Sequence, residues 1–294
     1  KLILQTRKSL KALRPDIAHA ITLKYAFITG LAALGLKVKC VHTIAGLGYL
    51  FSGEGFKPKL LRTLIGPFLK LACKNAALIF QNPDDMEIFI SRGLARKEQC
   101  HLIRGSGVDL EKFPAQEPAK NQTPVIVMPT RLVHEKGIAV FIEAGNILKS
   151  RGVDTKLQIA GGVSTTNPNA ISQQDMEEML TNSLVQWLGK VSDMPALFTA
   201  CDLVVYPSYY REGIPKVLLE AAASGHAIIT TNHPGCREAV TNGENGLLVP
   251  VKDATATADA IEKLLSDPQG LSTMGQASRK KAEAEFDVKL IVTQ

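Results

Sequence analysis

Short apolar segments and longer amphipathic segments alternate along the chain. Residues 1–13 carry apolar side chains at helical spacing with basic residues between them, which predicts a helix. Arg14-Pro15 ends this helix, because the residue before a proline is disfavoured in the helical conformation. A strand, a helix and two further strands are predicted next, at residues 16–20, 26–33, 37–43 and 77–80. Strands separated by helices indicate a parallel sheet with helices on its faces.

The same alternation restarts after a break. Gly105–Asp109 and the polar stretch Pro114–Pro124 are typical of a linker. Six strands are predicted beyond it, at Val125–Pro129, Leu157–Ala160, Val185–Leu188, Leu203–Tyr206, Ala227–Thr230 and Gly246–Val249. We therefore expect two Rossmann-like α/β domains, residues 1–118 and 119–281, that face a central cleft at the carboxyl ends of their strands. Residues 282–294 are expected to form a helix that crosses back to the first domain.

Composition supports two α/β domains. The chain has 294 residues, which is long for one small core, and 45% of them are hydrophobic. Only 5% are aromatic, and the apolar residues are mostly Ala, Leu, Val and Ile, which suit parallel strands covered by helices. An all-β sandwich is not expected.

Charge is distributed unevenly along the chain. The formal net charge is +6, but residues 1–118 hold 18 Lys and Arg against 9 Asp and Glu, while 119–294 hold 16 against 19. The basic first half predicts contact with a polyanionic surface, either membrane headgroups or nucleic acid. A solvated basic face without a partner is an alternative of equal weight.

Cysteine spacing and hydropathy bear on the compartment. The five cysteines lie at least 27 positions apart and form no Cys-x-x-Cys pair, which favours free thiols in a reducing compartment and gives no structural zinc motif. No apolar run reaches the roughly 20 residues that span a bilayer. The chain starts at Lys1 inside a predicted helix, without an initiator Met or a signal peptide, so we expect the first part of the first domain to be missing.

The most specific motif runs from Tyr206 to Glu220, where a predicted strand leads through a loop containing Glu212 into a helix. Pro215 is expected at the first helical position, where its missing N–H costs nothing. Three free amides at this helix N-terminus would suit a diphosphate, those of Gly213, Ile214 and Lys216. Glu220 can accept hydrogen bonds from ribose hydroxyls. A Glu-x7-Glu pair alone is common by chance, but the apolar strand and the small-residue helix Ala221–Gly225 make this one specific.

A second cationic element follows the predicted strand Val125–Pro129. Arg131 can bind phosphate oxygens in a bidentate manner, and Lys136 supplies a point charge. An isolated pair of this kind is usually surface charge. Its position at the carboxyl end of a strand favours neutralisation of a leaving diphosphate.

Segments over nearly the whole chain resemble family 4 of the glycosyltransferases, the retaining enzymes with the two-domain GT-B fold. The matching segments are Arg14–His19, Thr43–Tyr49, Gly107–Asp109, Thr130–Gly137, Ile159–Gly162, Gly189–Val191, Glu212–Glu220, Pro234–Glu238 and Asn242–Val249. The stretch with Gly46 and Gly48, and Tyr209–Glu212, are similar to the subgroup that builds cell-surface polysaccharides on undecaprenyl diphosphate carriers.

The resemblance implies an activity and a set of site residues. The activity is transfer of a hexose or N-acetylhexosamine, with retained configuration, from a nucleotide sugar to a saccharide on a polyprenyl diphosphate; the subgroup favours UDP. Arg131 and Lys136 would hold the donor diphosphate, Glu220 the ribose, and Glu212 the transferred sugar. The remaining donor-binding residues would be Gly213, Ile214, Pro215 and Lys216 at the helix start and Val191, Gly161 and Gly162 near the base.

The sequence departs from the family at Ala45, where many relatives carry a His that touches the donor sugar. His42 lies three positions earlier and is a weaker catalytic candidate. His19 ends a predicted strand, and it either lines the cleft, as His42, Gly46 and Gly48 would, or is a structural histidine.

No Asp-x-Asp sequence occurs, so the ligand motif of metal-dependent glycosyltransferases is missing. We expect no metal and no cofactor, with the cations and the helix N-terminus stabilising the leaving group instead. Basic residues of the first domain predict peripheral attachment to the anionic cytoplasmic face of the plasma membrane: Arg7, Lys8, Lys11, Lys57, Lys59, Arg62 and Lys70.

Two other function classes remain open at this stage. One is a sugar-nucleotide epimerase or phosphorylase of the same fold. The other is a non-catalytic module that binds a nucleotide sugar or a nucleic acid. The sequence shows no aromatic platform for stacking RNA bases, so a nucleic-acid partner is not expected.

Overall fold

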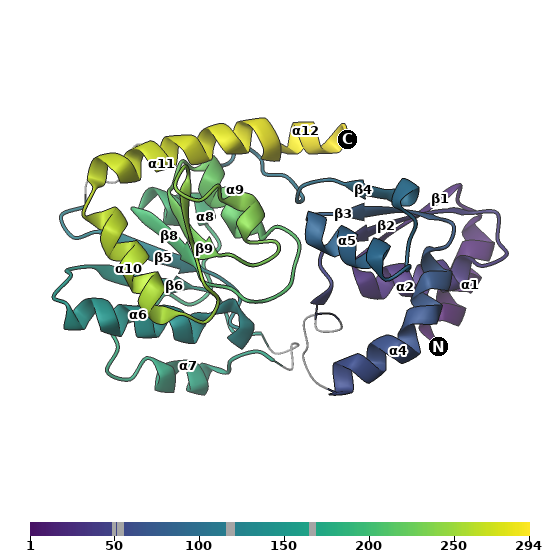
Figure 1. The fold of residues 1–294 in the computed structure, drawn as a ribbon, viewed down its shortest axis with the longest axis horizontal. Helices are drawn as coiled ribbons and strands as arrows, with labels where there is room; N and C mark the ends of the chain where they lie inside the picture. The colour runs from purple at the N-terminus through teal and green to yellow at the C-terminus, as the bar shows by residue number, and fades with distance from the viewer. Residues whose placement is uncertain (49–50, 52–55, 116–120, 165–168) are drawn as a thin grey trace. The chain divides into compact units, whose positions relative to one another are not determined.

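The computed structural model describes residues 1–48, 51, 56–115, 121–164 and 169–294 and divides into two compact units. The first comprises Lys1–Gly105 together with the short segment Arg211–Ile214, and the second comprises Ser106–Tyr210 and Pro215–Gln294. Each unit is built on one sheet, and both sheets are parallel, as predicted (Figure 1). Tyr49, the middle of the predicted linker and the side chain of Lys57 lie outside the described residues.

The first sheet has four strands in the order β1-β2-β3-β4. They are β1 (Ile17–Ile21), β2 (Lys39–Ile44), β3 (Ala76–Phe80) and β4 (Cys100–Leu102). The first three confirm the predicted strands, whereas β4 is a three-residue edge strand that the sequence pattern did not reveal. Buried residues alternate along β2 and β3, so that one side chain in two points into the core of this unit.

The helices of the first unit are α1 (Leu2–Leu13), α2 (Leu23–Ala33), α4 (Phe56–Cys73) and α5 (Pro83–Ser91), with a 3-10 turn η1 (Lys97–Gln99). Arg14 ends α1 in the left-handed conformation, directly before Pro15, as predicted. α2 packs against both α1 and α4, and Gly30 allows the close approach, because a Cβ there would lie 2.2 Å from the Ala72 carbonyl oxygen.

The second sheet has six strands in the order β10-β9-β8-β5-β6-β7. They are β5 (Val125–Pro129), β6 (Lys156–Ala160), β7 (Val185–Trp187), β8 (Leu203–Tyr206), β9 (Ile228–Thr231) and β10 (Gly246–Val249), each within a residue of its predicted bounds. The chain adds strands outward from β5 to β7 and then returns to place β8 on the other side of β5. Ligands of open α/β sheets bind at the carboxyl ends of strands at such a switch point.

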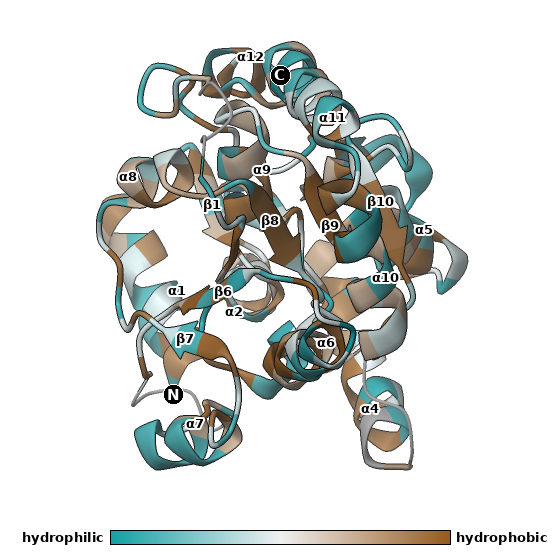
Figure 2. Cartoon of the chain, turned by 90° about the vertical axis from the view of Figure 1, so that its left-hand side faces the viewer, coloured by the Kyte–Doolittle hydropathy of each residue, from teal (hydrophilic) through white to brown (hydrophobic). Residues whose placement is uncertain are grey.

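Helices cover both faces of the second sheet. Figure 1 shows α6 (Ile138–Ser150) and α10 (Ala254–Leu265) on one side, and α8 (Met194–Thr199), α9 (Lys216–Ala223) and α11 (Pro268–Lys281) on the other. The remaining elements are α7 (Gln173–Met179), α12 (Val288–Val292), the 3-10 turns η2 (His134–Lys136) and η3 (Arg237–Ala239) and the π-helical turn η4 (Ala282–Phe286). β8 and β9 are buried throughout, and Figure 2 shows them as hydrophobic strands among helices with hydrophilic outer sides.

The C-terminal segment belongs to the second unit. Its backbone is paired with Val108, whose amide donates to the Phe286 carbonyl and whose carbonyl accepts from the Val288 amide. The predicted return of residues 282–294 to the first domain, and the domain bounds 1–118 and 119–281, stay predictions.

All five cysteines are free thiols, as predicted. Among the described residues, no helix combines the length and apolar character needed to cross a bilayer.

Candidate active site

The carboxyl edge of the second sheet carries most of the predicted donor-binding residues. β5 leads to Arg131, β6 to Gly161 and Gly162, and β7 to the loop that contains Val191. β8 leads to the loop before Pro215. Because the strands are parallel, these loops lie at one edge of the sheet, and those after β5 and β8 flank the switch point.

The two predicted cations differ in their surroundings. Lys136 is only 2% exposed, and its Nζ lies 5.3 Å from the ring centroid of Tyr206 and 5.0 Å from that of Tyr210. The electron-rich ring faces stabilise an ammonium in a place with little water. Arg131 is exposed, so its guanidinium can turn toward a ligand in solution.

Backbone contacts fix the loop that carries Lys136. The carbonyl of Glu135 accepts hydrogen bonds from the Tyr209 amide at 2.9 Å and from the Ser208 hydroxyl at 3.4 Å. Gly137 follows with φ at 82°, and a Cβ there would lie 2.1 Å from the Pro207 carbonyl oxygen, so only glycine fits. The loops after β5 and β8 are therefore fastened to each other.

Gly161 and Gly162 lie where two further loops approach. A Cβ at Gly161 would lie 2.0 Å from the Thr130 carbonyl oxygen, and the carbonyl of Gly161 accepts a hydrogen bond of 2.7 Å from the Trp187 indole. A Cβ at Gly162 would lie 3.0 Å from Cβ of Lys190, next to Val191. The lack of a side chain at Gly161 is thus required by packing, and its role beside a nucleotide stays a prediction.

The start of α9 differs from the sequence prediction in two details. Pro215 is not the first helical residue but the residue before it, because its ψ of 126° is extended; its carbonyl accepts from the Leu218 amide. The amide of Gly213 is not free, because it donates a hydrogen bond of 3.0 Å to the Ala45 carbonyl. The amides of Ile214 and Lys216 donate no hydrogen bond to a described residue, so they match the prediction.

Glu220 is buried on α9 and 8% exposed. Burial raises the pKa of its carboxyl group, and the positive charges of Lys216 and Lys112 oppose this effect. The carboxylate receives no hydrogen bond from another described residue. It is therefore a strong acceptor in a poorly solvated position, as a group that binds neutral hydroxyls requires.

Glu212 lies in the segment Arg211–Ile214, which packs with the first unit. Gly46 has φ at 113°, and a Cβ there would lie 2.5 Å from Cα of Glu212. Gly48 donates its amide to the Arg211 carbonyl at 3.2 Å. Gly46 thus makes room for the backbone that carries Glu212, and Gly48 is hydrogen-bonded to the residue before it.

A buried ion pair holds the same segment. Nε of Arg211 lies 2.8 Å from Oδ1 of Asp85, whose side chain is fully buried. Burial raises the pKa of Asp85 despite the opposing effects of Arg211 and Asn82. The Asn82 side chain also donates to the other Asp85 carboxyl oxygen and to the Glu212 carbonyl, at 3.1 and 3.3 Å. Sequence reasoning missed Asn82 and Asp85, although a helix-capping Asn-Pro directly after a predicted strand is a recognisable signal.

The two candidate histidines differ in exposure: His19 is exposed and His42 is buried. Nε2 of His19 lies 2.8 Å from the Thr43 hydroxyl on the adjacent strand. His42 is fully buried with Cys40 and Ile44 on the inward side of β2, and burial lowers its pKa. The cleft position predicted for His42 is therefore wrong, because strand alternation turns its ring into the core.

A family model described as glycosyl transferases group 1 matches residues 109–281. Among curated proteins, the chain is 32% identical over 274 residues to the N,N'-diacetylbacillosaminyl-diphospho-undecaprenol alpha-1,3-N-acetylgalactosaminyltransferase of Campylobacter jejuni. That match covers 88% of this chain and 70% of the relative.

Two further relatives match over most of their length. The chain is 29% identical to a capsular polysaccharide biosynthesis glycosyltransferase of Staphylococcus aureus, over 95% of this chain and 74% of the relative. It is 28% identical to the UDP-Gal:alpha-D-GlcNAc-diphosphoundecaprenol alpha-1,3-galactosyltransferase of Escherichia coli. That match covers 98% of this chain and 76% of the relative.

Solved structures share the fold. The sucrose-phosphate synthase of Thermosynechococcus elongatus superimposes with a TM-score of 0.83 at 23% identity, covering 100% of this chain and 77% of that protein. Anabaena HepE in complex with UDP superimposes with a TM-score of 0.81 at 22% identity, covering 99% of this chain and 80% of that protein.

We expect the Arg211–Asp85 pair to matter for stability mainly when one partner is removed. Asp85→Ala leaves a largely buried guanidinium without its carboxylate and should lower the free energy of unfolding by about 3 kcal/mol. The double variant Asp85→Ala/Arg211→Ala should lose less free energy of unfolding than the two single variants lose together. Denaturant titration of the four proteins measures both quantities.

Asp259→Ala is the matched control, because it breaks an exposed pair with Arg151, at 2.8 Å. Its effect should be much smaller, because solvent screens an exposed ion pair. Equal losses for Asp85→Ala and Asp259→Ala would show that the buried pair does not hold the segment.

Proposed function

We propose that this chain, which belongs to the group 1 glycosyl transferases, moves a hexose or N-acetylhexosamine from a nucleotide sugar to a saccharide on a polyprenyl diphosphate. The predicted family and its GT-B fold are confirmed by the family model and by the solved structures. The observation that carries the substrate class is the match along 88% of the chain to a relative named for transfer to a diphospho-undecaprenol-linked sugar. UDP as the donor's nucleotide is supported by the name of the Escherichia coli relative.

The carboxyl edge of the second sheet binds the donor in this proposal. Lys136 and Arg131 neutralise the diphosphate, the first from a buried position and the second from solvent. The amides at the start of α9 add the partial positive charge of a helix N-terminus. Glu220 accepts hydrogen bonds from the ribose hydroxyls, and the Gly161–Gly162 and Val191 loops border the base.

Glu212 contacts the transferred sugar in this proposal. Transfer retains the anomeric configuration, as the family resemblance implies, and the leaving diphosphate takes the proton of the acceptor hydroxyl. The negative charge that develops on the diphosphate is stabilised by fixed cations and amides, so the reaction uses no metal and no other cofactor. Exclusion of water protects the donor from hydrolysis.

Neither alternative function is favoured by the comparisons. The relatives described above are named as transferases, not as epimerases or phosphorylases. A non-catalytic module would explain the donor-binding residues but gives no reason for the likeness to enzymes along nearly the whole chain.

The first unit rests on the anionic cytoplasmic face of the membrane in this proposal. The basic side chains of Lys8, Lys11, Lys59 and Lys70 are exposed, and each cation near an anionic leaflet contributes about 1 kcal/mol. Arg7 contributes less than the sequence suggested, because its guanidinium donates to the carbonyls of Ala32 and Leu34 at 2.8 and 2.6 Å.

Lys136→Met tests the electrostatic part of the donor site. The variant keeps most of the buried stem but removes the charge, so we expect the turnover number to fall about a hundredfold or more. Lys149→Met, an exposed residue on α6, is the control and should retain full turnover. Single-turnover transfer assays with and without EDTA measure both effects, and loss of activity in EDTA would contradict the metal-free mechanism.

The pH dependence of UDP affinity in the native protein and in Glu220→Gln tests the ribose contact. Ionised Glu220 accepts hydrogen bonds best, so UDP affinity of the native protein should weaken as the pH falls from neutral through its raised pKa. The Gln variant should bind UDP more weakly at neutral pH and lose this pH dependence. Calorimetric titration at several pH values checks the expectation.

The same substitution should not destabilise the fold. A carboxyl group whose pKa is raised on folding costs stability when it is ionised, and this cost disappears as the pH falls through the raised pKa. Glu220→Gln should therefore unfold at the same temperature as the native protein or a higher one at neutral pH. A variant that loses UDP binding because it is unfolded would be recognised by this measurement.

Vesicle flotation tests the membrane contact. The native chain should float with vesicles that contain phosphatidylglycerol and detach as salt rises, because exposed charges are screened. Lys8→Gln/Lys11→Gln should float less than Lys149→Gln/Lys156→Gln, which removes two cations from the second unit. Flotation that depends on neither anionic lipid nor salt would remove this part of the proposal.

A further inference from the structure

We propose that a pocket in the first unit binds the diphosphate of the lipid-linked acceptor, an inference that rests on the function proposed above. The pocket has a volume of about 640 Å³ and lies between α4 and the turn Arg92–Leu94 that follows α5. It is a different site from the donor site, because all of its lining residues belong to the first unit and none lies at the edge of the second sheet.

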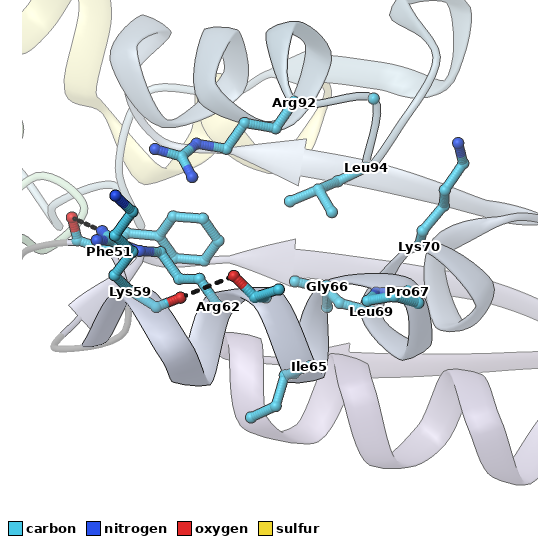
Figure 3. Close-up of a pocket in the computed structure, with 12 residues that line it drawn as sticks. Phe51, Lys59, Arg62, Ile65, Gly66, Pro67, Leu69, Lys70, Arg92 and Leu94 are labelled. Carbon is cyan, nitrogen blue, oxygen red and sulfur yellow. Dashed lines mark hydrogen bonds between the residues drawn. The ribbon is translucent and has the colours of Figure 1, made fainter. Parts of the chain in front are cut away.

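The described residues that line the pocket include four cations and no carboxylate. Lys59, Arg62 and Lys70 project from α4, and Arg92 projects from the opposite wall (Figure 3). None of the four forms an ion pair with a described carboxylate. Like charges gathered without counter-ions repel one another, so an anion that fits among them is bound favourably.

The two arginines of the pocket are held in place by Phe51. The guanidinium of Arg92 lies 5.6 Å from the ring centroid of Phe51, and a nitrogen of Arg62 donates to the Phe51 carbonyl at 3.5 Å. Figure 3 shows these two side chains at the same end of the pocket as Phe51, with Lys70 at the other end. Two guanidinium groups near one aromatic ring provide the planar donors that phosphate oxygens accept best.

The floor of the pocket is apolar. Leu69 and Leu94 line it, and both are buried. A free phosphate gains nothing from such a surface. A diphosphate with an attached hydrocarbon chain gains from both the cations and the floor.

An exposed apolar side of α4 adjoins the cationic side. Leu60, Leu64 and Phe68 follow at intervals of four residues and are 46%, 60% and 56% exposed, and Leu61 and Leu71 extend this side. A helix with basic residues on one side and large apolar residues on another is typical of a membrane interface. The geometry therefore accounts for a polyprenyl diphosphate, whose anionic head lies in the pocket while its chain leaves along this apolar side into the bilayer.

Kinetics with the full chain test the assignment. Arg62→Ala and Arg92→Ala should each raise the KM for a polyprenyl-diphosphate-linked saccharide about tenfold, while the turnover number at saturating acceptor and the affinity for UDP stay unchanged. Lys74→Ala, an exposed cation that follows α4 outside the pocket, is the matched control and should leave the KM unchanged. Unchanged KM values in both Arg variants would overturn the proposal.

Binding separates this proposal from the proposed function. Vesicles of a neutral phospholipid with added undecaprenyl diphosphate should bind the native chain more tightly than vesicles of the same phospholipid with phosphatidylglycerol added to the same total charge. Arg62→Ala/Arg92→Ala should abolish that preference while retaining the melting temperature. No preference in the native chain, or equal loss on both vesicles, would assign the cations to general leaflet contact. If the preference holds but no saccharide is transferred, the transferase reaction is wrong and the lipid diphosphate site stands.

Discussion

The proposed donor site depends on one buried positive charge. Placing the Lys136 ammonium at the carboxyl edge of the second sheet costs solvation, and the rings of Tyr206 and Tyr210 return part of that cost. Because little water remains around it, this ammonium interacts with an anion more strongly than a solvated lysine does. The fixed backbone of Glu135 and Gly137 then keeps the charge at one place, which a developing negative charge requires.

The sequence predicts the second sheet almost completely, because each strand is a short apolar run between turn residues. Leu203–Tyr206 and Gly246–Val249 match the observed strands residue for residue. In contrast, the apolar spacing of α4 does not show which side of the helix is buried, since Leu64 and Phe68 are exposed while Leu69 is buried. Hydrophobic periodicity reports which side of a helix is buried in protein, so it fails where apolar residues have another use.

The errors at the candidate site arise from contacts between segments far apart in the sequence. Gly213 was expected to leave its amide free, but the Ala45 carbonyl accepts it, and no local pattern connects these two residues. The same holds for Asp85 and Arg211, which are 126 positions apart. Gly46 could be singled out by resemblance, yet its reason, the approach of the Glu212 backbone, is visible only in the structure. Sequence patterns thus identify the strand ends that carry chemistry, and tertiary contacts decide which groups remain available to a ligand.

The exposed side of α4 has a cost that a purely soluble role does not explain. Leaving Leu60, Leu64 and Phe68 in water forgoes the roughly 25 cal/mol per Å² that burial of apolar surface provides, and it exposes a patch that favours aggregation. Placing cations beside that patch does not reduce the cost in water. At the surface of a bilayer the cost of exposure falls, because the apolar side chains enter the lipid and the cations contact phosphate groups. In the proposed function, the first unit therefore suits a substrate that is anionic and apolar at once, whereas the second suits one that is anionic and polar.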